Sequence, residues 1–159
     1  MRATEPHRDL RLQIQRAFME APRPVGRELA GHECPECDHL RKTLGRYEAD
    51  EVPEDVIDFF GDSLPLLAPQ GLRYYLPAYL LRALRDPNYD RVNYLVYHLA
   101  PSKKDLRDSA EYWESMLVVF NPSERAAVLS FVKWLAETEI GKEYAQELDR
   151  ALHIWAGHA

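Results

Sequence analysis

The chain has 159 residues, a hydrophobic fraction of 46% and a formal net charge of −6. Such a length predicts one domain with a core of its own, and the excess of acids argues against nucleic acid as a partner. The sequence lacks an apolar run of the ~20 residues that span a bilayer and an N-terminal signal peptide, so we expect one cytoplasmic domain over residues 1–159 with no membrane partner.

The first third of the chain predicts short helices around one long loop. Apolar residues recur at every third or fourth position over residues 5–20, which indicates a helix. Prolines and glycines then punctuate the chain, and we place a loop over residues 21–35. A short helix over residues 36–45 and another that opens at Pro53 follow.

Charge is distributed unevenly around this point. Residues 47–64 carry seven acidic groups and no basic one, whereas residues 65–104 carry six basic and two acidic groups. An acidic segment beside a basic one indicates either a surface for a partner or a solvated helix face, and the solvated face is the commoner case. Its acidic members are Glu48, Asp50, Glu51, Glu54, Asp55, Asp58 and Asp62.

The most distinctive apolar stretch is GLRYYLPAYLLRAL, residues 71–84. Its apolar residues keep helical spacing throughout, but Pro77 donates no N–H and crowds the preceding turn, so we expect a kinked helix. The commoner interpretation is a central helix of the core. The functional interpretation is a kink that shapes a cleft, with candidate binding residues Arg73, Tyr74, Tyr75 and Tyr79.

Helical periodicity is strong in the second half of the chain. It predicts helices over residues 92–99, 106–120 and 140–155, and a further helix that Asn121 caps with Glu124 as the partner of a capping box. No segment shows the sustained alternation of a strand. The sequence therefore predicts an all-α fold, a compact irregular bundle of about six to eight helices with a proline-kinked central helix.

Three segments resemble a known family. RYYLPAYL, residues 73–80, resembles the core of an uncharacterised bacterial family, a domain of unknown function with an R-Y-Y-L-P-A-Y/F-L motif. NPSERAAVLSF, residues 121–131, is similar to the closing segment of that family, and ECPEC, residues 33–37, loosely resembles a cysteine-containing stretch upstream of the core. The resemblance covers residues 32–135 and implies a small helical protein without an established reaction.

The two cysteines, Cys34 and Cys37, form a single C-x-x-C whose thiolates can reach one zinc ion. His153 and His158 would complete a tetrahedral site if the last helix packs beside the cysteines. A catalytic redox pair is a second interpretation, but no strand precedes the motif and nearby acids would raise the thiol pKa values. The third interpretation, which we favour narrowly, is a turn with two half-buried thiols that anchors the N-terminal segment.

The sequence contains no G-x-S-x-G, P-loop, G-x-G-x-x-G or H-E-x-x-H motif. We therefore expect a non-enzymatic protein-binding protein, of the adaptor or toxin-neutralising type, without a cofactor. Its acidic or tyrosine-rich face would hold a protein partner that is basic, because opposite charge steers association. The alternative is a zinc-binding or thiol-redox protein centred on the C-x-x-C, and zinc would then be its cofactor.

Overall fold

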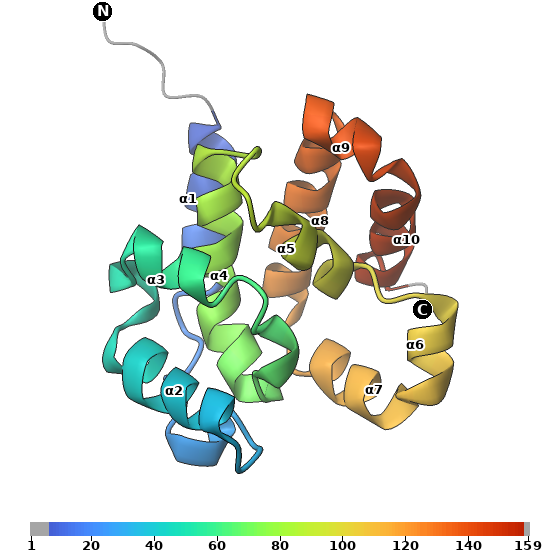
Figure 1. Cartoon of the computed structure of the whole chain (residues 1–159). Coiled ribbons are helices and arrows are strands. Elements are labelled where there is room, and N and C mark those ends of the chain that lie inside the picture. The colour runs from blue at the N-terminus through green and yellow to red at the C-terminus, as the bar shows by residue number, and fades with distance from the viewer. Residues whose placement is uncertain (1–6, 158–159) are drawn as a thin grey trace, which may run out of the picture.

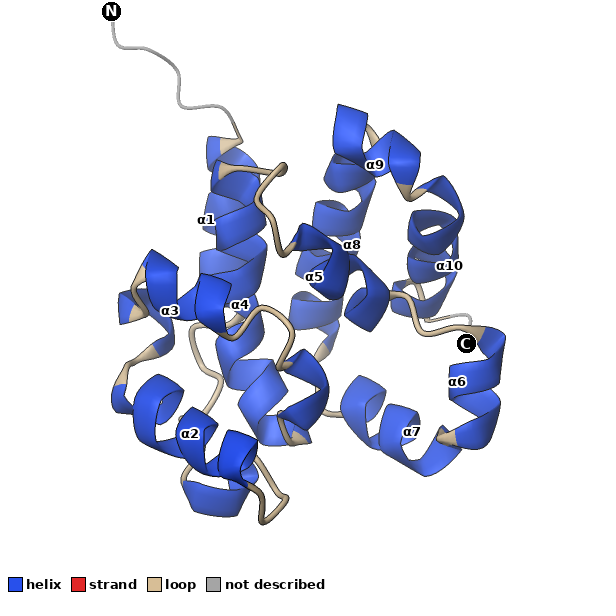
Figure 2. Ribbon diagram, viewed as in Figure 1, coloured by secondary structure: helices blue, strands red, loops and turns tan. Residues whose placement is uncertain are grey.

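The computed structural model describes residues 7–157. It is 72% helical, with ten α-helices of which seven have seven residues or more, and the described residues contain no strand (Figure 2). The prediction of an all-α fold is confirmed. Within the same residues no helix is long and apolar enough to cross a membrane.

The first five helices are α1 (Arg8–Ala17), α2 (Pro35–Thr43), α3 (Glu54–Phe59), α4 (Pro69–Arg85) and α5 (Val92–Leu99). The last five are α6 (Lys103–Asp108), α7 (Ala110–Val118), α8 (Pro122–Ala136), α9 (Glu139–Glu143) and α10 (Ala145–Trp155). Four short 3₁₀ turns lie between them, at Gly26–Glu28, Leu44–Arg46, Ala49–Glu51 and Leu64–Leu66.

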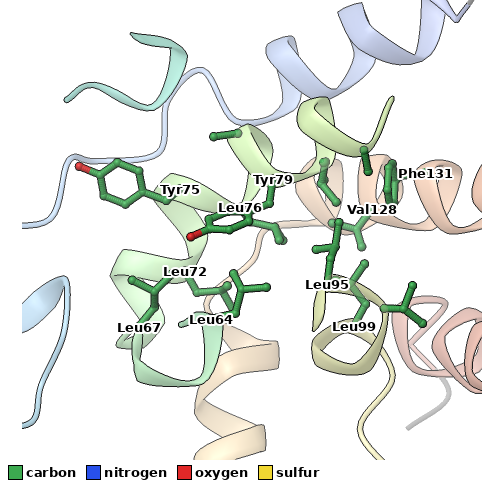
Figure 3. Packing of buried hydrophobic residues seen from close by; sticks show 14 of the residues in the cluster. Leu64, Leu67, Leu72, Tyr75, Leu76, Tyr79, Leu95, Leu99, Val128 and Phe131 are labelled. Carbon is green, nitrogen blue, oxygen red and sulfur yellow. The ribbon is translucent and has the colours of Figure 1, made fainter. Parts of the chain in front are cut away.

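Helices α1, α4 and α8 occupy the middle of the molecule (Figure 1). Helix α8 packs against α1 and α10, and α4 packs against α1 and α3. The buried face of α4 carries Tyr75, Leu76 and Tyr79, which have no exposed surface. They belong to one cluster with Val128 and Phe131 of α8, and Figure 3 shows Tyr75 at the end of that cluster away from Phe131. One contiguous apolar cluster therefore joins elements from both halves of the chain.

Helix α4 runs unbroken from Pro69 to Arg85 with Pro77 inside it. A proline in a helix interior costs about 3 kcal/mol through the lost hydrogen bond and the steric clash. Burial of each large apolar side chain contributes about 1.5–3 kcal/mol, and Leu76 and Leu80 on either side of the proline are completely buried. Packing thus holds α4 as one helix instead of two short ones.

The expected capping box at the start of α8 is confirmed. The Asn121 side chain accepts a hydrogen bond from the backbone N–H of Glu124 at 2.8 Å, and the Glu124 carboxylate accepts one from the Asn121 N–H at 2.7 Å. Pro122 occupies the first turn, where its missing N–H costs nothing.

Two helices that the periodicity predicts as single units are each divided. The segment over residues 106–120 breaks at Ser109, between α6 and α7, and the last helix breaks at Tyr144, between α9 and α10. Both residues have non-helical dihedral angles, with φ −128° and ψ 41° at Ser109 and φ −112° and ψ 30° at Tyr144. Such breaks turn the chain without disturbing the spacing of its apolar residues, which is why periodicity does not reveal them.

The expected loop over residues 21–35 contains one 3₁₀ turn and ends where α2 begins at Pro35. Its carbonyl at Leu29 accepts a hydrogen bond from the N–H of Ala68 at 2.9 Å. A side chain at Gly71 would collide with the Leu29 backbone, so glycine lets the loop approach the first turn of α4. The loop is therefore tied to the central helix just before the cysteine motif.

Candidate functional site

Two of the predicted binding residues, Tyr75 and Tyr79, lie in the core with no exposed surface. The Tyr75 hydroxyl donates to the carbonyl oxygens of Leu44 at 3.2 Å and Tyr47 at 2.8 Å. The Tyr79 hydroxyl donates to the carbonyl oxygen of Phe60 at 3.0 Å. Burial raises the pKa of Tyr75 to about 12, so its hydroxyl remains a proton donor at neutral pH.

The other two predicted binding residues also have structural partners. The Tyr74 hydroxyl accepts a hydrogen bond from the N–H of Ala49 at 3.2 Å. The Arg73 Nε lies 2.9 Å from both carboxylate oxygens of Glu124, whose side chain is completely buried. A buried carboxylate is tolerated only when it is paired and hydrogen-bonded, and Glu124 has both Arg73 and the cap of α8.

The burial of Tyr75 and Tyr79 agrees with the commoner interpretation, a central helix of the core, and not with a tyrosine-lined cleft. Because Tyr75 and Tyr79 are buried, they cannot line a cleft that is open to solvent. The tyrosine hydroxyls instead bond to the 3₁₀ turns over residues 44–51 and to the end of α3, where backbone groups lack partners within a regular helix. Helices α4 and α8 meet at the ion pair between Arg73 and Glu124.

The cysteines lie at the start of α2, where Cys34 is the N-cap and its sulfur accepts a hydrogen bond from the N–H of Cys37 at 3.4 Å. His153 is on α10, exposed, with Nδ1 2.8 Å from the carbonyl oxygen of Asp149. Helices α2 and α10 lie at opposite sides of the molecule (Figure 1). Because α10 packs its apolar face against α8 and α5, the structure does not bring His153 to the cysteines.

The fourth predicted metal ligand, His158, lies outside the described residues. Within residues 7–157, the only group of three or more His, Cys, Asp or Glu ligand atoms that lie close enough for one ion is Glu48, Asp50 and Glu51. These three acids are exposed, and such clusters are common without a metal. The described residues therefore do not assemble the zinc site that the C-x-x-C suggests.

An acidic pocket of about 510 Å³ lies where α3, the end of α4 and the loop before α5 meet. Four carboxylates and two guanidinium groups line it, which leaves an excess of two negative charges. The lining residues of this acidic pocket are Asp55, Asp58, Phe59, Arg82, Asp86, Asn88, Tyr89, Asp90 and Arg91.

Arg82 organises the acidic pocket. Its Nε and Nη2 donate to the two carboxylate oxygens of Asp58 at 2.8 and 3.1 Å, and Nη2 lies 3.4 Å from Glu54. Its Cζ lies 4.5 Å from the centroid of the Tyr89 ring, a cation–π contact. The hydrogen bonds that Arg82 donates to Asp58 raise the pKa of Arg82 against the opposing effect of burial. Arg82 is therefore charged, and Asp58 balances that charge.

The remaining carboxylates of the acidic pocket have few hydrogen-bond or ion-pair partners. Asp86 accepts a hydrogen bond from the N–H of Asn88 at 3.0 Å, which closes a turn just after α4. Asp55 and Asp90 are exposed, and the described residues give neither carboxylate an ion-pair or hydrogen-bond partner. Phe59 is 61% exposed at the rim, so the acidic pocket offers anionic oxygens beside an apolar ring.

Elsewhere the acidic segment over residues 47–64 is partly neutralised by arginines. Arg23 lies 4.0 Å from Glu48, Arg85 lies 3.6 Å from Glu54, and Arg91 lies 3.8 Å from Asp62. Three acids of the acidic segment, Glu54, Asp58 and Asp62, therefore pair with arginines of the basic segment. The broad acidic face that the sequence suggests divides into the acidic pocket and the exposed cluster of Glu48, Asp50 and Glu51.

Asp55 and Asp58 belong to the acidic segment that stands out in the sequence, whereas Arg82, Asp86 and Asp90 do not. The missed signal is the DPNYDR stretch, residues 86–91, directly after a helix that ends in arginine. Asp-Pro-Asn is a strong turn signal, and a turn at that point brings its two aspartates back toward the end of the helix. The pairing of Arg82 with α3 depends on tertiary packing and leaves no trace in the local pattern.

Fold and geometry together define a small all-α protein with an aspartate-rich surface pocket. The chain belongs to a family of unknown function, DUF6714, whose model matches residues 7–159. The resemblance to a family of unknown function is thereby confirmed. No curated protein and no solved structure matches the chain.

Proposed function

We propose that this protein is a non-enzymatic binding protein that holds a basic segment of a partner protein in the acidic pocket. The observation that carries the proposal is the pair of exposed carboxylates without partners, Asp55 and Asp90, beside the exposed ring of Phe59. An adaptor or toxin-neutralising role in the cytoplasm follows from the same idea, since either role requires capture of a partner without chemistry.

The chemistry of the acidic pocket favours a lysine or arginine side chain. Its charged end would form charge-assisted hydrogen bonds with Asp55 and Asp90, which are stronger than neutral ones. Its aliphatic stem would cover Phe59, as long basic side chains often bury their methylene groups on apolar surface. Arg82 does not strongly repel a basic side chain of the partner, because Asp58 and Glu54 already balance the charge of Arg82.

The electrostatics also favour capture over a catalytic role. Negative charge concentrated in a depression attracts a basic partner from a distance and accelerates association. Such attraction is screened by salt over a Debye length of about 10 Å at 0.1 M ionic strength. We therefore expect binding that weakens steadily as salt is added.

Nuclear magnetic resonance with defined peptides tests the proposal. A short capped peptide of alternating arginine and glycine should shift the amide signals of Asp55, Phe59 and Asp90, and the shifts should shrink at high salt. A matched peptide of alternating glutamate and glycine should shift none of them. Shifts spread evenly over all acidic surface residues would contradict a defined site.

A pair of matched variants sharpens the test. Asp55→Asn with Asp90→Asn removes two negative charges from the acidic pocket, and Glu137→Gln with Glu143→Gln removes two from exposed positions near α9. We expect the arginine peptide to lose affinity for the first variant only. Equal losses in both variants would show that net charge, and not the acidic pocket, binds the peptide.

A further inference from the structure

The two cysteines sit at a helix end in unequal surroundings. Cys34 is partly exposed at the N-cap of α2, a helix of nine residues, whereas Cys37 has no exposed surface. The Cys34 sulfur accepts a hydrogen bond from the backbone N–H of Cys37 at 3.4 Å. The Cys34 sulfur is thus accessible to solvent, whereas the neighbouring Cys37 side chain is shielded from it.

The acids that flank the cysteines in the sequence are largely paired in the structure. Three acids flank the motif, and negative charge disfavours a thiolate. In the structure Glu33 is paired with Arg27, and Asp38 with Arg41 at 2.5 Å. With those two acids paired, the contact that the Cys34 sulfur keeps at the start of α2 is the Cys37 N–H at 3.4 Å.

We propose that Cys34 and Cys37 form a reversible thiol–disulfide couple in which Cys34 attacks a small external disulfide and Cys37 resolves the product. This proposal does not depend on the acidic pocket. A small disulfide suits the site because Cys34 is only partly exposed, and Cys37 is buried, so neither sulfur presents an open face to a second protein.

The exchange balances without any further reagent. The Cys34 thiolate attacks one sulfur of the external disulfide, a mixed disulfide forms, and the other half leaves as a thiolate. The deprotonated Cys37 sulfur then attacks the Cys34 sulfur, which closes the Cys34–Cys37 bond and releases the second half. Two electrons pass from the protein to the external disulfide, and the two protons lost by the cysteines are taken up by the released thiols.

The surroundings of Cys37 fit the role of the second sulfur. Burial raises the pKa of the Cys37 thiol, and its hydrogen bond with Cys34 adds to that effect. Cys37 therefore stays protonated and inert until the first step, which removes the Cys34 thiolate beside it. The backbone N–H of His32 and the Arg41 guanidinium oppose burial and help the thiol to ionise.

The test uses the full chain and uncharged hydroxyethyl disulfide, with acid quenching and mass spectrometry. The wild-type protein should lose two hydrogen atoms and keep no adduct, and dithiothreitol should restore it. Cys37→Ser should accumulate a stable mixed disulfide on Cys34. Cys34→Ser should react at least about tenfold more slowly than Cys37→Ser, because its remaining thiol is buried.

Two controls keep the outcome decisive. Serine is a preferred N-cap residue, so Cys34→Ser should retain the circular dichroism of the folded protein. In urea both single variants should react at the same rate, which would show that the fold sets the order of the two cysteines. A folded wild-type protein that keeps a mixed disulfide without closing, or a Cys34→Ser variant that reacts as fast as Cys37→Ser, would overturn the proposal.

Discussion

The middle and the C-terminal end of α4 use the same residue types in opposite ways. In the middle, Arg73 pairs with a carboxylate that has no exposed surface, and the tyrosine hydroxyls donate to backbone carbonyls. At the end, Arg82 pairs with the partly exposed Asp58 and leaves Asp55 and Asp90 facing solvent. Burial and satisfied partners thus distinguish the scaffold from the candidate site, whereas residue type does not.

The largest effect should come from breaking the ion pair in the middle of α4. Glu124→Gln keeps a capping side chain but leaves Arg73 without its charge partner, and such a change typically costs about 3–5 kcal/mol. Urea unfolding would measure the loss. Glu143→Gln, at an exposed position, serves as the control and should change stability by less than about 0.5 kcal/mol.

A double variant separates the pair from its surroundings. Arg73→Met with Glu124→Gln removes both charges, so it should recover part of the loss that Glu124→Gln causes. If Glu124→Gln costs no more than the exposed control, then the middle of α4 is not held by this contact.

The core face of the same helix should respond almost as strongly. Leu76 has no exposed surface, and Leu76→Ala should cost about 2–5 kcal/mol through lost burial and the cavity that remains. Val118→Ala is the control because Val118 is 74% exposed. A loss below about 1 kcal/mol at Leu76 would contradict the role of α4 as the centre of the core.

A third prediction concerns His98 on α5, which is buried against Trp113 with no hydrogen-bond partner for its Nε2 among the described residues. Burial lowers the pKa of His98 to about 4 from 6.5. The unfolded chain therefore binds a proton between these values that the folded protein does not. The free energy of unfolding should therefore be highest above pH 6.5 and should fall as the pH drops toward 4. The expected loss is roughly 3 kcal/mol, because each unit of pKa difference corresponds to about 1.36 kcal/mol.

Unfolding curves at several pH values would measure this loss. His98→Phe keeps the aromatic contact and removes the titration, so the difference between wild type and variant should isolate the histidine. Identical pH profiles for the two proteins would show that other groups cause the acid sensitivity.

Periodicity predicted the helices well because the same apolar spacing that identifies them also buries them. Val92, Leu95, Val96 and Leu99 are all buried, as their spacing indicates. The capping box was predictable too, because Asn121 and Glu124 act locally. The breaks at Ser109 and Tyr144 were not, since a turn between two short helices can preserve apolar spacing.

The candidate site was less predictable for a related reason. The tyrosines look like a binding surface in the sequence, but the 3₁₀ turns over residues 44–51 and the end of α3 accept hydrogen bonds from their hydroxyls. The acidic pocket joins α3 to a loop about thirty residues later in the chain, and no local pattern reports such a contact. His153 lies more than a hundred residues after the cysteines, so local pattern could not assign it to them or away from them.

Calorimetric titration of the alternating arginine–glycine peptide tests the central claim most directly. Wild type is compared with a variant that combines Asp55→Asn, Asp86→Asn and Asp90→Asn, and asparagine at position 86 can still accept the turn hydrogen bond. We expect the variant to unfold within about 0.5 kcal/mol of wild type, and to bind the peptide at least about tenfold more weakly, a difference of about 1.4 kcal/mol. Equal affinities, with both proteins folded, would show that the acidic pocket does not bind basic segments.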